Sequence, residues 1–180
     1  GLVDKMYKFG RPRLMERGVE CCILEVIDQN QRAIKVYKRI GFKEIGKRYC
    51  YTGSVIAHQK VVLRETTLKE IIKLFDDGHY AWDNTFATLK MAQETYRKYL
   101  VYDPEDDALI GYFVVNQQTG YLAQLEARDE FWHHLFSGVS QICPTIKINN
   151  IHWNRTGLLR FLDDNGFENT INQFEMRWSV

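Results

Sequence analysis

Residues 22–51 read CILEVIDQNQRAIKVYKRIGFKEIGKRYCY, and residues 146–176 read IKINNIHWNRTGLLRFLDDNGFENTINQFEM. Both stretches begin with an apolar strand and continue with an asparagine, a short amphipathic helix, the pair Gly-Phe and another strand. Two copies of one supersecondary unit indicate two related domains in the chain.

The register of the repeat holds almost throughout. Asn30 and Asn154 stand 124 positions apart, whereas Gly41 and Gly166 stand 125 apart, so the second helix contains one additional residue. In the first copy the asparagine is a favoured helix N-cap, and the glycine suits a left-handed residue that ends a helix. The spacing therefore predicts a strand, a capped helix from about 31 to 40, a stop and a second strand.

At these residues the chain resembles the GNAT superfamily of acetyl-CoA-dependent N-acetyltransferases. The C-terminal half of that family reads Leu-Glu-Val, a few residues, then Asn-x-x-Ala-x-x-x-Tyr-x-x-x-Gly-Phe. The matching positions in this chain are Leu24, Glu25, Val26, Asn30, Ala33, Tyr37, Gly41 and Phe42. The resemblance implies a mixed, mostly antiparallel sheet flanked by helices (class α/β or α+β), with one partial copy followed by a nearly complete one.

Composition narrows the class of protein further. The 180 residues are 45% apolar, which is enough for a packed core, and 24 basic against 23 acidic side chains leave almost no net charge to attract nucleic acid. The sequence contains no apolar run of the roughly 20 residues that a membrane helix needs, and no signal-peptide pattern. We therefore expect a cytoplasmic protein that binds neither nucleic acid nor membranes.

The cysteines and histidines do not follow a metal-binding or disulfide pattern. Cys21 and Cys22 are neighbours on one predicted strand, and the remaining two cysteines are far apart in the sequence. His133 and His134 are also neighbours, without the i, i+4 spacing that places two imidazoles on one helix face. The sequence therefore predicts buried free thiols and no metal site.

The first eighteen residues have helical spacing but no preceding strand or cap. In the GNAT fold such a helix follows the fourth strand, so we expect a fragment whose first domain lacks its N-terminal half. Further elements are predicted at about 21–27 and 43–51, with a turn at 52–54. The strand expected at 59–66 fits either the end of the first domain or the start of the second. We place the boundary at 57, with a first domain at 1–57 and a degenerate second domain at 58–180.

The second domain is predicted to follow the GNAT order of elements. Residues 68–78 form an amphipathic helix, and the region 86–99 carries a second helical pattern. Two strands flanking residues 116–119 form a hairpin, and a helix is expected at about 129–141 before the second copy of the repeat.

The resemblance assigns chemistry to three residues of the first copy. Tyr37 matches the tyrosine that often protonates the departing thiolate of acetyl-CoA, and Asn30 and Ala33 match positions that hold the arm of that cofactor. Periodicity alone favours a core tyrosine and an N-cap asparagine, and the cap and cofactor roles of Asn30 are compatible.

The second copy departs from the family at several positions. The family binds pyrophosphate at Arg/Gln-x-x-Gly-x-Gly/Ala on a helix N-terminus, where residues 127–131 here read ARDEF. We expect Asp129 and Glu130 to place two carboxylates in the first helical turn and to exclude acetyl-CoA, although a different binding mode through Arg128 stays open. The counterpart of Tyr37 is Phe161 or Leu162, neither of which donates a proton.

Three further polar residues lie in or near the motif regions. Asn154 is explained by a helix cap. Glu126, on the predicted fourth strand of the second domain, is the only candidate base in that domain. Glu25 points from a strand in the first copy, and we assign it no role.

Three functions agree with the sequence. In the leading hypothesis the chain is the C-terminal part of a tandem acetyltransferase that moves an acetyl group from acetyl-CoA to a small-molecule or peptide amine, and the fragment alone is inactive. Alternatively, the second domain is a binding or dimerisation module, with a possible homodimer, or an active transferase with altered chemistry. The acceptor amine is not readable from the sequence.

Overall fold

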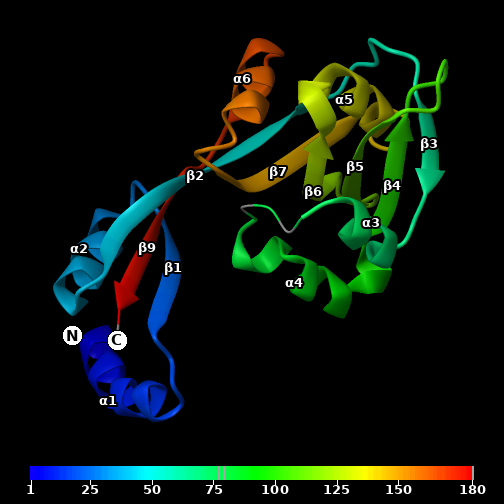
Figure 1. The fold of residues 1–180 in the computed structure, drawn as a ribbon. Helices are drawn as coiled ribbons and strands as arrows, with labels where there is room; N and C mark the ends of the chain where they lie inside the picture. The colour runs from blue at the N-terminus through cyan, green and yellow to red at the C-terminus, as the bar shows by residue number, and fades with distance from the viewer. Residues whose placement is uncertain (77, 79, 180) are drawn as a thin grey trace. The chain divides into compact units, whose positions relative to one another are not determined.

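The computed structural model describes residues 1–76, 78 and 80–179, without the side chain of residue 129 (Figure 1). The chain divides into two compact units. Unit 1 consists of residues 1–48 together with 171–180, and unit 2 consists of residues 49–170.

Unit 1 contains two helices and three strands. Its elements are α1 (Leu2–Glu16), β1 (Cys21–Ile27), α2 (Gln31–Ile40), the first half of β2 (Lys43–Ser54) and β9 (Gln173–Ser179). The C-terminal strand β9 lies between β1 and β2 and pairs antiparallel with both (Figure 1). The last strand of the chain therefore completes the sheet of the first repeat copy.

The core of unit 1 lies between this sheet and its two helices. Alternate residues of β9 point to the same face, where Met176 is fully buried and Trp178 is 8% exposed. These side chains pack against Ile34 of α2 and against Phe42, which directly follows the helix. Helix α1 contributes no buried residue, and its Tyr7 ring lies edge-on to the Trp178 ring at a centroid distance of 4.9 Å.

Unit 2 is built on a larger sheet in the order β2-β7-β6-β5-β4-β3, with β8 paired to β2. Its strands are the second half of β2, β3 (Val62–Glu65), β4 (Arg97–Tyr102), β5 (Leu109–Asn116), β6 (Tyr121–Ala127), β7 (Thr145–His152) and β8 (Glu168–Asn169). Its helices are α3 (Leu68–Leu74), α4 (Phe86–Met91), α5 (Trp132–Ser140) and α6 (Thr156–Asp164), with 3₁₀ turns at Trp82–Asn84, Gln93–Thr95 and Arg128–Glu130. The pairs from β3 to β6 are antiparallel, whereas β6 and β7 are parallel.

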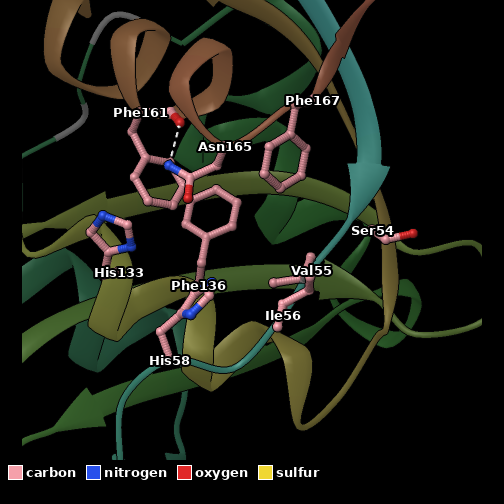
Figure 2. A pocket seen from close by; sticks show the side chains of 9 residues that line it. All are labelled: Ser54, Val55, Ile56, His58, His133, Phe136, Phe161, Asn165 and Phe167. Atoms are coloured by element: carbon pink, nitrogen blue, oxygen red, sulfur yellow. Dashed lines mark hydrogen bonds between the residues drawn. The ribbon is translucent and has the colours of Figure 1, made fainter.

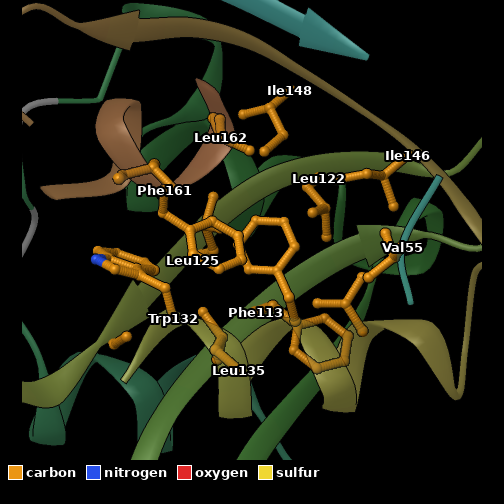
Figure 3. Close-up of a cluster of buried hydrophobic side chains, with 14 of the residues drawn as sticks. Val55, Phe113, Leu122, Leu125, Trp132, Leu135, Ile146, Ile148, Phe161 and Leu162 are labelled. Atoms are coloured by element: carbon orange, nitrogen blue, oxygen red, sulfur yellow. The ribbon is translucent and has the colours of Figure 1, made fainter. Parts of the chain in front are cut away.

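Helices cover both faces of the unit 2 sheet. Phe113 and Val115 of β5 are fully buried on the face that carries α5 and α6 (Figure 3). Tyr112 and Val114, which alternate with them, belong to a second cluster beneath α3 and α4. The mixed, mostly antiparallel sheet flanked by helices confirms the predicted fold class.

Several predicted elements are confirmed, the helix predicted at 68–78 ends at Leu74, and four further elements are corrected. Helices at 2–16 and 31–40, the strand at 21–27 and the hairpin of β5 and β6 lie where they were expected. The helix predicted over 86–99 ends at 91, because 97–102 form β4. The turn predicted at 52–54 lies within β2, and the helix expected from 129 begins at Trp132. The strand after Gly166-Phe167 is divided, and its longer part is β9 of unit 1.

The strand with two possible assignments belongs to unit 2. Strand β3 pairs along its length with β4, so it is the edge strand of the unit 2 sheet. The division at residue 57 follows the two copies of the repeat, whereas the two units follow spatial contacts. The division into domains 1–57 and 58–180 therefore stays a prediction.

Candidate functional site

The three residues expected to form a site in the first copy all belong to α2 or its cap. The Asn30 side-chain oxygen accepts a hydrogen bond from the backbone N–H of Ala33 at 3.1 Å, which confirms the predicted cap. Ala33 and Tyr37 follow at three and seven positions after Asn30, a spacing that places all three on one side of the helix. The structure therefore brings these three residues together, as the motif requires.

Tyr37 is held by the end of its own helix. Its ring lies edge-on to the ring of Phe42 at a centroid distance of 5.9 Å, and its carbonyl accepts the backbone N–H groups of Gly41 and Phe42. Gly41 has φ = 113°, and a Cβ at this position would lie 3.1 Å from the Trp178 ring. Glycine is therefore required both for the turn and for the close approach of Trp178.

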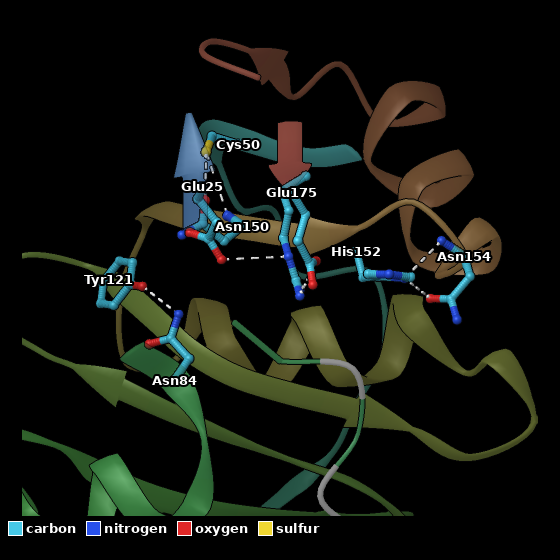
Figure 4. A network of polar contacts seen from close by, with 9 residues as sticks. Glu25, Cys50, Asn84, Tyr121, Asn150, His152, Asn154 and Glu175 are labelled. Carbon is cyan, nitrogen blue, oxygen red and sulfur yellow. Dashed lines mark hydrogen bonds and ion pairs between the residues drawn. The ribbon is translucent and has the colours of Figure 1, made fainter. Parts of the chain in front are cut away.

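Glu25, which received no role from the sequence, takes part in an ion-pair cluster of unit 1. It lies opposite Glu175 in the pairing of β1 with β9. The Arg48 guanidinium contacts both carboxylates, with Nη2 2.6 Å from Glu175 and Nε 3.6 Å from Glu25 (Figure 4). Two like charges on facing strands repel one another, so Arg48 stabilises their proximity.

In unit 2 the region before the second copy of the helix is formed by the ends of strands β6 and β7. The parallel strands β6 and β7 pair only at Tyr121 with Lys147 and at Leu122 with Ile148. Beyond these two pairs, the carbonyl groups of β6 that face β7 require other hydrogen-bond donors.

Arg155 supplies those donors at the end of β6. Its Nη2 donates to the Leu125 carbonyl and to a Glu126 carboxylate oxygen, both at 2.7 Å. Its guanidinium also lies 5.3 Å from the ring centre of Tyr80 and 5.9 Å from that of Trp132. The Tyr80 hydroxyl donates to the same Leu125 carbonyl at 2.9 Å. Arg155 and Tyr80 therefore fill the space between the ends of β6 and β7. The cavity that is left between these strands has a volume of about 10 Å³.

Glu126, the candidate base, is consequently engaged in an ion pair. Burial raises the pKa of the Glu126 carboxyl above its ordinary value, and the charge of Arg155 offsets part of that rise. Outside this pair lies an open hollow of about 380 Å³, lined by Phe75, Asp76, Gly78, Glu126, Asn154 and Arg155. Arg155 gave no signal in the sequence, because the family pattern contains no arginine at that position.

The loop before α5 differs from its prediction. Residues Arg128–Glu130 form a 3₁₀ turn, and Glu130 has φ = 58°, so it precedes the helix rather than entering its first turn. A Cβ at Gly157 would lie 2.5 Å from a Glu130 carboxylate oxygen, which places that carboxylate beside the first turn of α6. A carboxylate at the start of a helix is electrostatically favourable. The predicted place of the Asp129 side chain lies outside the described residues.

Asn154 does not cap α6, contrary to the prediction. The N-cap residue is Arg155, and no side chain caps this helix. The Asn154 side-chain oxygen instead lies 2.5 Å from His152 Nδ1 (Figure 4). Phe161 and Leu162, the two possible counterparts of Tyr37, are both buried in the apolar core of unit 2.

A further cavity of about 40 Å³ lies among aromatic side chains of unit 2 (Figure 2). His58 and His133 lie on its wall with ring centroids 5.9 Å apart. The loop that carries His58 is held by Ser137, whose hydroxyl accepts the backbone N–H groups of His58 and Gln59 at 3.0 Å. The volume is enough for a few water molecules only.

No protein-family model and no curated protein matches the sequence. Solved structures match the fold. A GCN5-related N-acetyltransferase from Sphaerobacter thermophilus is similar with a TM-score of 0.67 at 12% identity, over 99% of this chain and 68% of that one. A GCN5-related N-acetyltransferase from Kribbella flavida gives a TM-score of 0.63 at 8% identity, over 97% of this chain and 74% of that one. This chain has a GNAT fold.

The GNAT fold extends over the whole chain, but the chain spans only part of some similar proteins. A putative acetyltransferase from Pyrococcus horikoshii matches 94% of this chain with a TM-score of 0.62 and 16% identity, and 58% of its own length is covered. Identities this low establish the fold alone. In the part of this chain that the structure describes, no helix is long and apolar enough to cross a bilayer. No group of three His, Cys, Asp or Glu side chains suitable for a metal ion occurs among the described residues.

Proposed function

We propose that this chain is part of an N-acetyltransferase that transfers the acetyl group of acetyl-CoA to a small-molecule or peptide amine. In this proposal residues 1–57 are the C-terminal half of a first GNAT domain, and residues 58–180 are a second, degenerate copy. The observation that carries the proposal is the capped helix α2, which presents Asn30, Ala33 and Tyr37 on one side.

The proposed roles in the first copy follow from the chemistry of these side chains. The phenol of Tyr37 is the general acid that protonates the departing thiolate, which requires it to lie within roughly 3 Å of the sulfur. Asn30 keeps a free amide group for the cofactor arm while its oxygen caps the helix, and Ala33 leaves space beside the helix. Packing of the Tyr37 ring against Phe42 holds the phenol in a defined direction.

We propose that the second copy does not catalyse transfer. Arg155 and Tyr80 satisfy the Leu125 carbonyl, and Phe161 or Leu162 replaces the proton-donating tyrosine. Glu126 is paired with Arg155, so it is not available as an unpaired base.

A binding or dimerisation module is the second candidate function. The open hollow beside Glu126 and Arg155 favours it, because a carboxylate and a guanidinium stand together at a cavity of small-molecule size. In that case the second copy holds a ligand or a second protomer without acetyl-CoA chemistry.

Titration of the ¹⁵N-labelled chain with acetyl-CoA distinguishes these functions residue by residue. We expect amide shifts at 30–37 at millimolar cofactor, because only half of the proposed site is present in this chain. The Asn30→Ala variant removes these shifts, whereas Arg155→Gln leaves them unchanged.

Two results contradict the proposal. Shifts concentrated at 127–131 and 154–157 would place the cofactor in the second copy. If no amide shift occurs at 30–37 at the highest concentration of acetyl-CoA that stays in solution, Asn30 and Ala33 do not belong to the cofactor site.

A further inference from the structure

The link between β2 and β3 runs along helix α5 without regular secondary structure of its own, and we call this segment, residues 55–61, the strap. One side chain of α5 holds its middle. The hydroxyl of Ser137 accepts the backbone N–H groups of His58 and Gln59, each at 3.0 Å, and donates to the carbonyl of His133 at 2.7 Å. Ser137 is fully buried, so the strap covers the hydroxyl that binds it.

A pair of imidazole rings joins the strap to α5 beside these hydrogen bonds. The rings of His58 and His133 lie edge to face, with centroids 5.9 Å apart and planes at 85° (Figure 2). The His133 ring also lies edge-on to Phe161 of α6 at 4.9 Å. The same two histidines stand on the wall of the cavity of about 40 Å³ that Phe136, Phe161 and Phe167 line. The strap therefore closes an aromatic surface of unit 2.

The surroundings of the two rings offer no opposite charge. None of the nine described residues that line the cavity is acidic, and His58 and His133 are the two that titrate. The Asp163 carboxylate of α6 accepts a hydrogen bond from the Tyr51 hydroxyl at 2.7 Å, and Lys60 adds a positive charge to the strap itself. Protons on both rings would therefore bring two positive charges together without a carboxylate among the lining residues to offset them.

We propose that His58 and His133 form an acid-sensitive latch, which releases the strap from α5 when both rings carry a proton and thereby opens the aromatic cavity. A single proton is tolerated, because a cationic ring against a neutral aromatic ring is favourable. The released strap separates the rings, so it accepts the second proton more readily than the closed strap. By linkage, a fall in pH therefore shifts the population toward the released state. Histidine charges in the physiological range, between about pH 8 and about pH 5.

The test is binding of the dye 1-anilinonaphthalene-8-sulfonate to the whole chain, because this dye fluoresces on exposed apolar surface. Between about pH 7.5 and about pH 5.5 we expect a rise in dye fluorescence of about threefold. The amide resonances of His58 and Gln59 should shift over the same interval, because their hydrogen bonds to Ser137 are lost. Both histidines are exposed, so the experiment is made at low salt, and added salt should weaken the response by screening.

Three variants define the latch. His58→Gln and His133→Gln should each abolish the pH response, because either one leaves a single imidazole in the pair. The matched control is His134→Gln, which removes an imidazole from the same helix, where its ring lies against Phe131 and outside the cavity wall. This control should keep the full response.

Two further variants separate charge from packing. Ser137→Ala removes the acceptor of both strap amides, so it should bind the dye already at about pH 7.5 and give the amide shifts of the acid form. If His58→Gln loosens the strap at neutral pH through loss of the ring contact, His58→Phe replaces it, because it keeps a ring that takes no proton. We expect the strap of His58→Phe to stay closed at both pH values.

Three results overturn the proposal. The first is dye fluorescence of the unaltered chain that does not change with pH. The second is an equal loss of the response in His134→Gln and in the variants of the pair, or a strap that still opens with acid in His58→Phe. The third is a set of amide shifts spread over β5 and β6 together with a loss of helical circular dichroism, which would assign the dye binding to general unfolding. None of these measurements depends on acetyl transfer, so the latch and the proposed function fail separately.

Discussion

At the residue scale, the side chain of Arg155 organises the end of strand β6 in the second copy of the repeat. A single side chain satisfies a backbone carbonyl, neutralises Glu126 and contacts two aromatic rings. The sequence predicts from Asp129 and Glu130 that this copy has lost its cofactor site, and that loss stays a prediction. The contacts of Arg155 are long-range in sequence, so no local pattern of residues indicates them.

We expect Arg155→Ala to lower the free energy of unfolding by about 1 to 2 kcal/mol, because it leaves the Glu126 carboxylate unpaired and removes a donor from Leu125. The loss is moderate because the Glu126 side chain is 39% exposed and can be hydrated. Urea denaturation measures the change. Arg160→Ala, on the exposed side of the same helix, is the control, and equal effects of both substitutions would contradict the role of Arg155.

At the element scale, the two asparagines of the repeat show how far a motif predicts structure. Asn30 caps α2 as expected, since its local sequence determines both the cap and the stop at Gly41. Asn154 occupies the same place in the repeat, yet α6 begins after Arg155, and Asn154 pairs with His152 instead. The additional residue of the second copy and the tertiary contacts of Arg155 shift the start of that helix. Local sequence alone cannot indicate this shift.

The two positions therefore form a matched pair of substitutions. We expect Asn30→Ala to cost about 1 kcal/mol of stability through loss of the cap. Asn154→Ala should cost less, because no backbone N–H of α6 depends on it. Urea midpoints of both variants give the comparison. A larger loss of stability in Asn154→Ala than in Asn30→Ala would contradict the assignment of the helix cap to Asn30 and not to Asn154.

At the scale of the whole molecule, the sequence predicted most strands but not all of their partners. The strand β1 follows from its apolar run and β9 from its alternating residues, whereas the placement of β9 between β1 and β2 depends on contacts between residues 125 to 158 positions apart. Strand β4 was missed because its sequence continues the helical spacing of the residues before it. The separation of positive charge into unit 1 is already present in the sequence of residues 1–48, which carry twelve basic and six acidic side chains, and residues 171–180 add one of each.

Met176 provides a test of this pairing, because β9 places it fully buried in the core of unit 1. We expect Met176→Ala to lower the free energy of unfolding of unit 1 by about 2 to 4 kcal/mol. Amide hydrogen exchange should show loss of protection in β1 that exceeds the loss in β5. Arg177→Ala, an exposed neighbour, is the control, and a loss confined to β5 and β6 would contradict the assignment of β9 to unit 1.

The position of β9 also has a consequence for biosynthesis. A ribosome adds about 5 to 20 residues each second, so roughly 10 to 30 seconds separate the emergence of β1 from that of its partner. During this interval Val26 and the apolar side of α2 have no strand to cover them, and open strand edges invite pairing with other chains. We expect the nascent polypeptide to depend on chaperones until residues Gln173–Ser179 have left the exit tunnel.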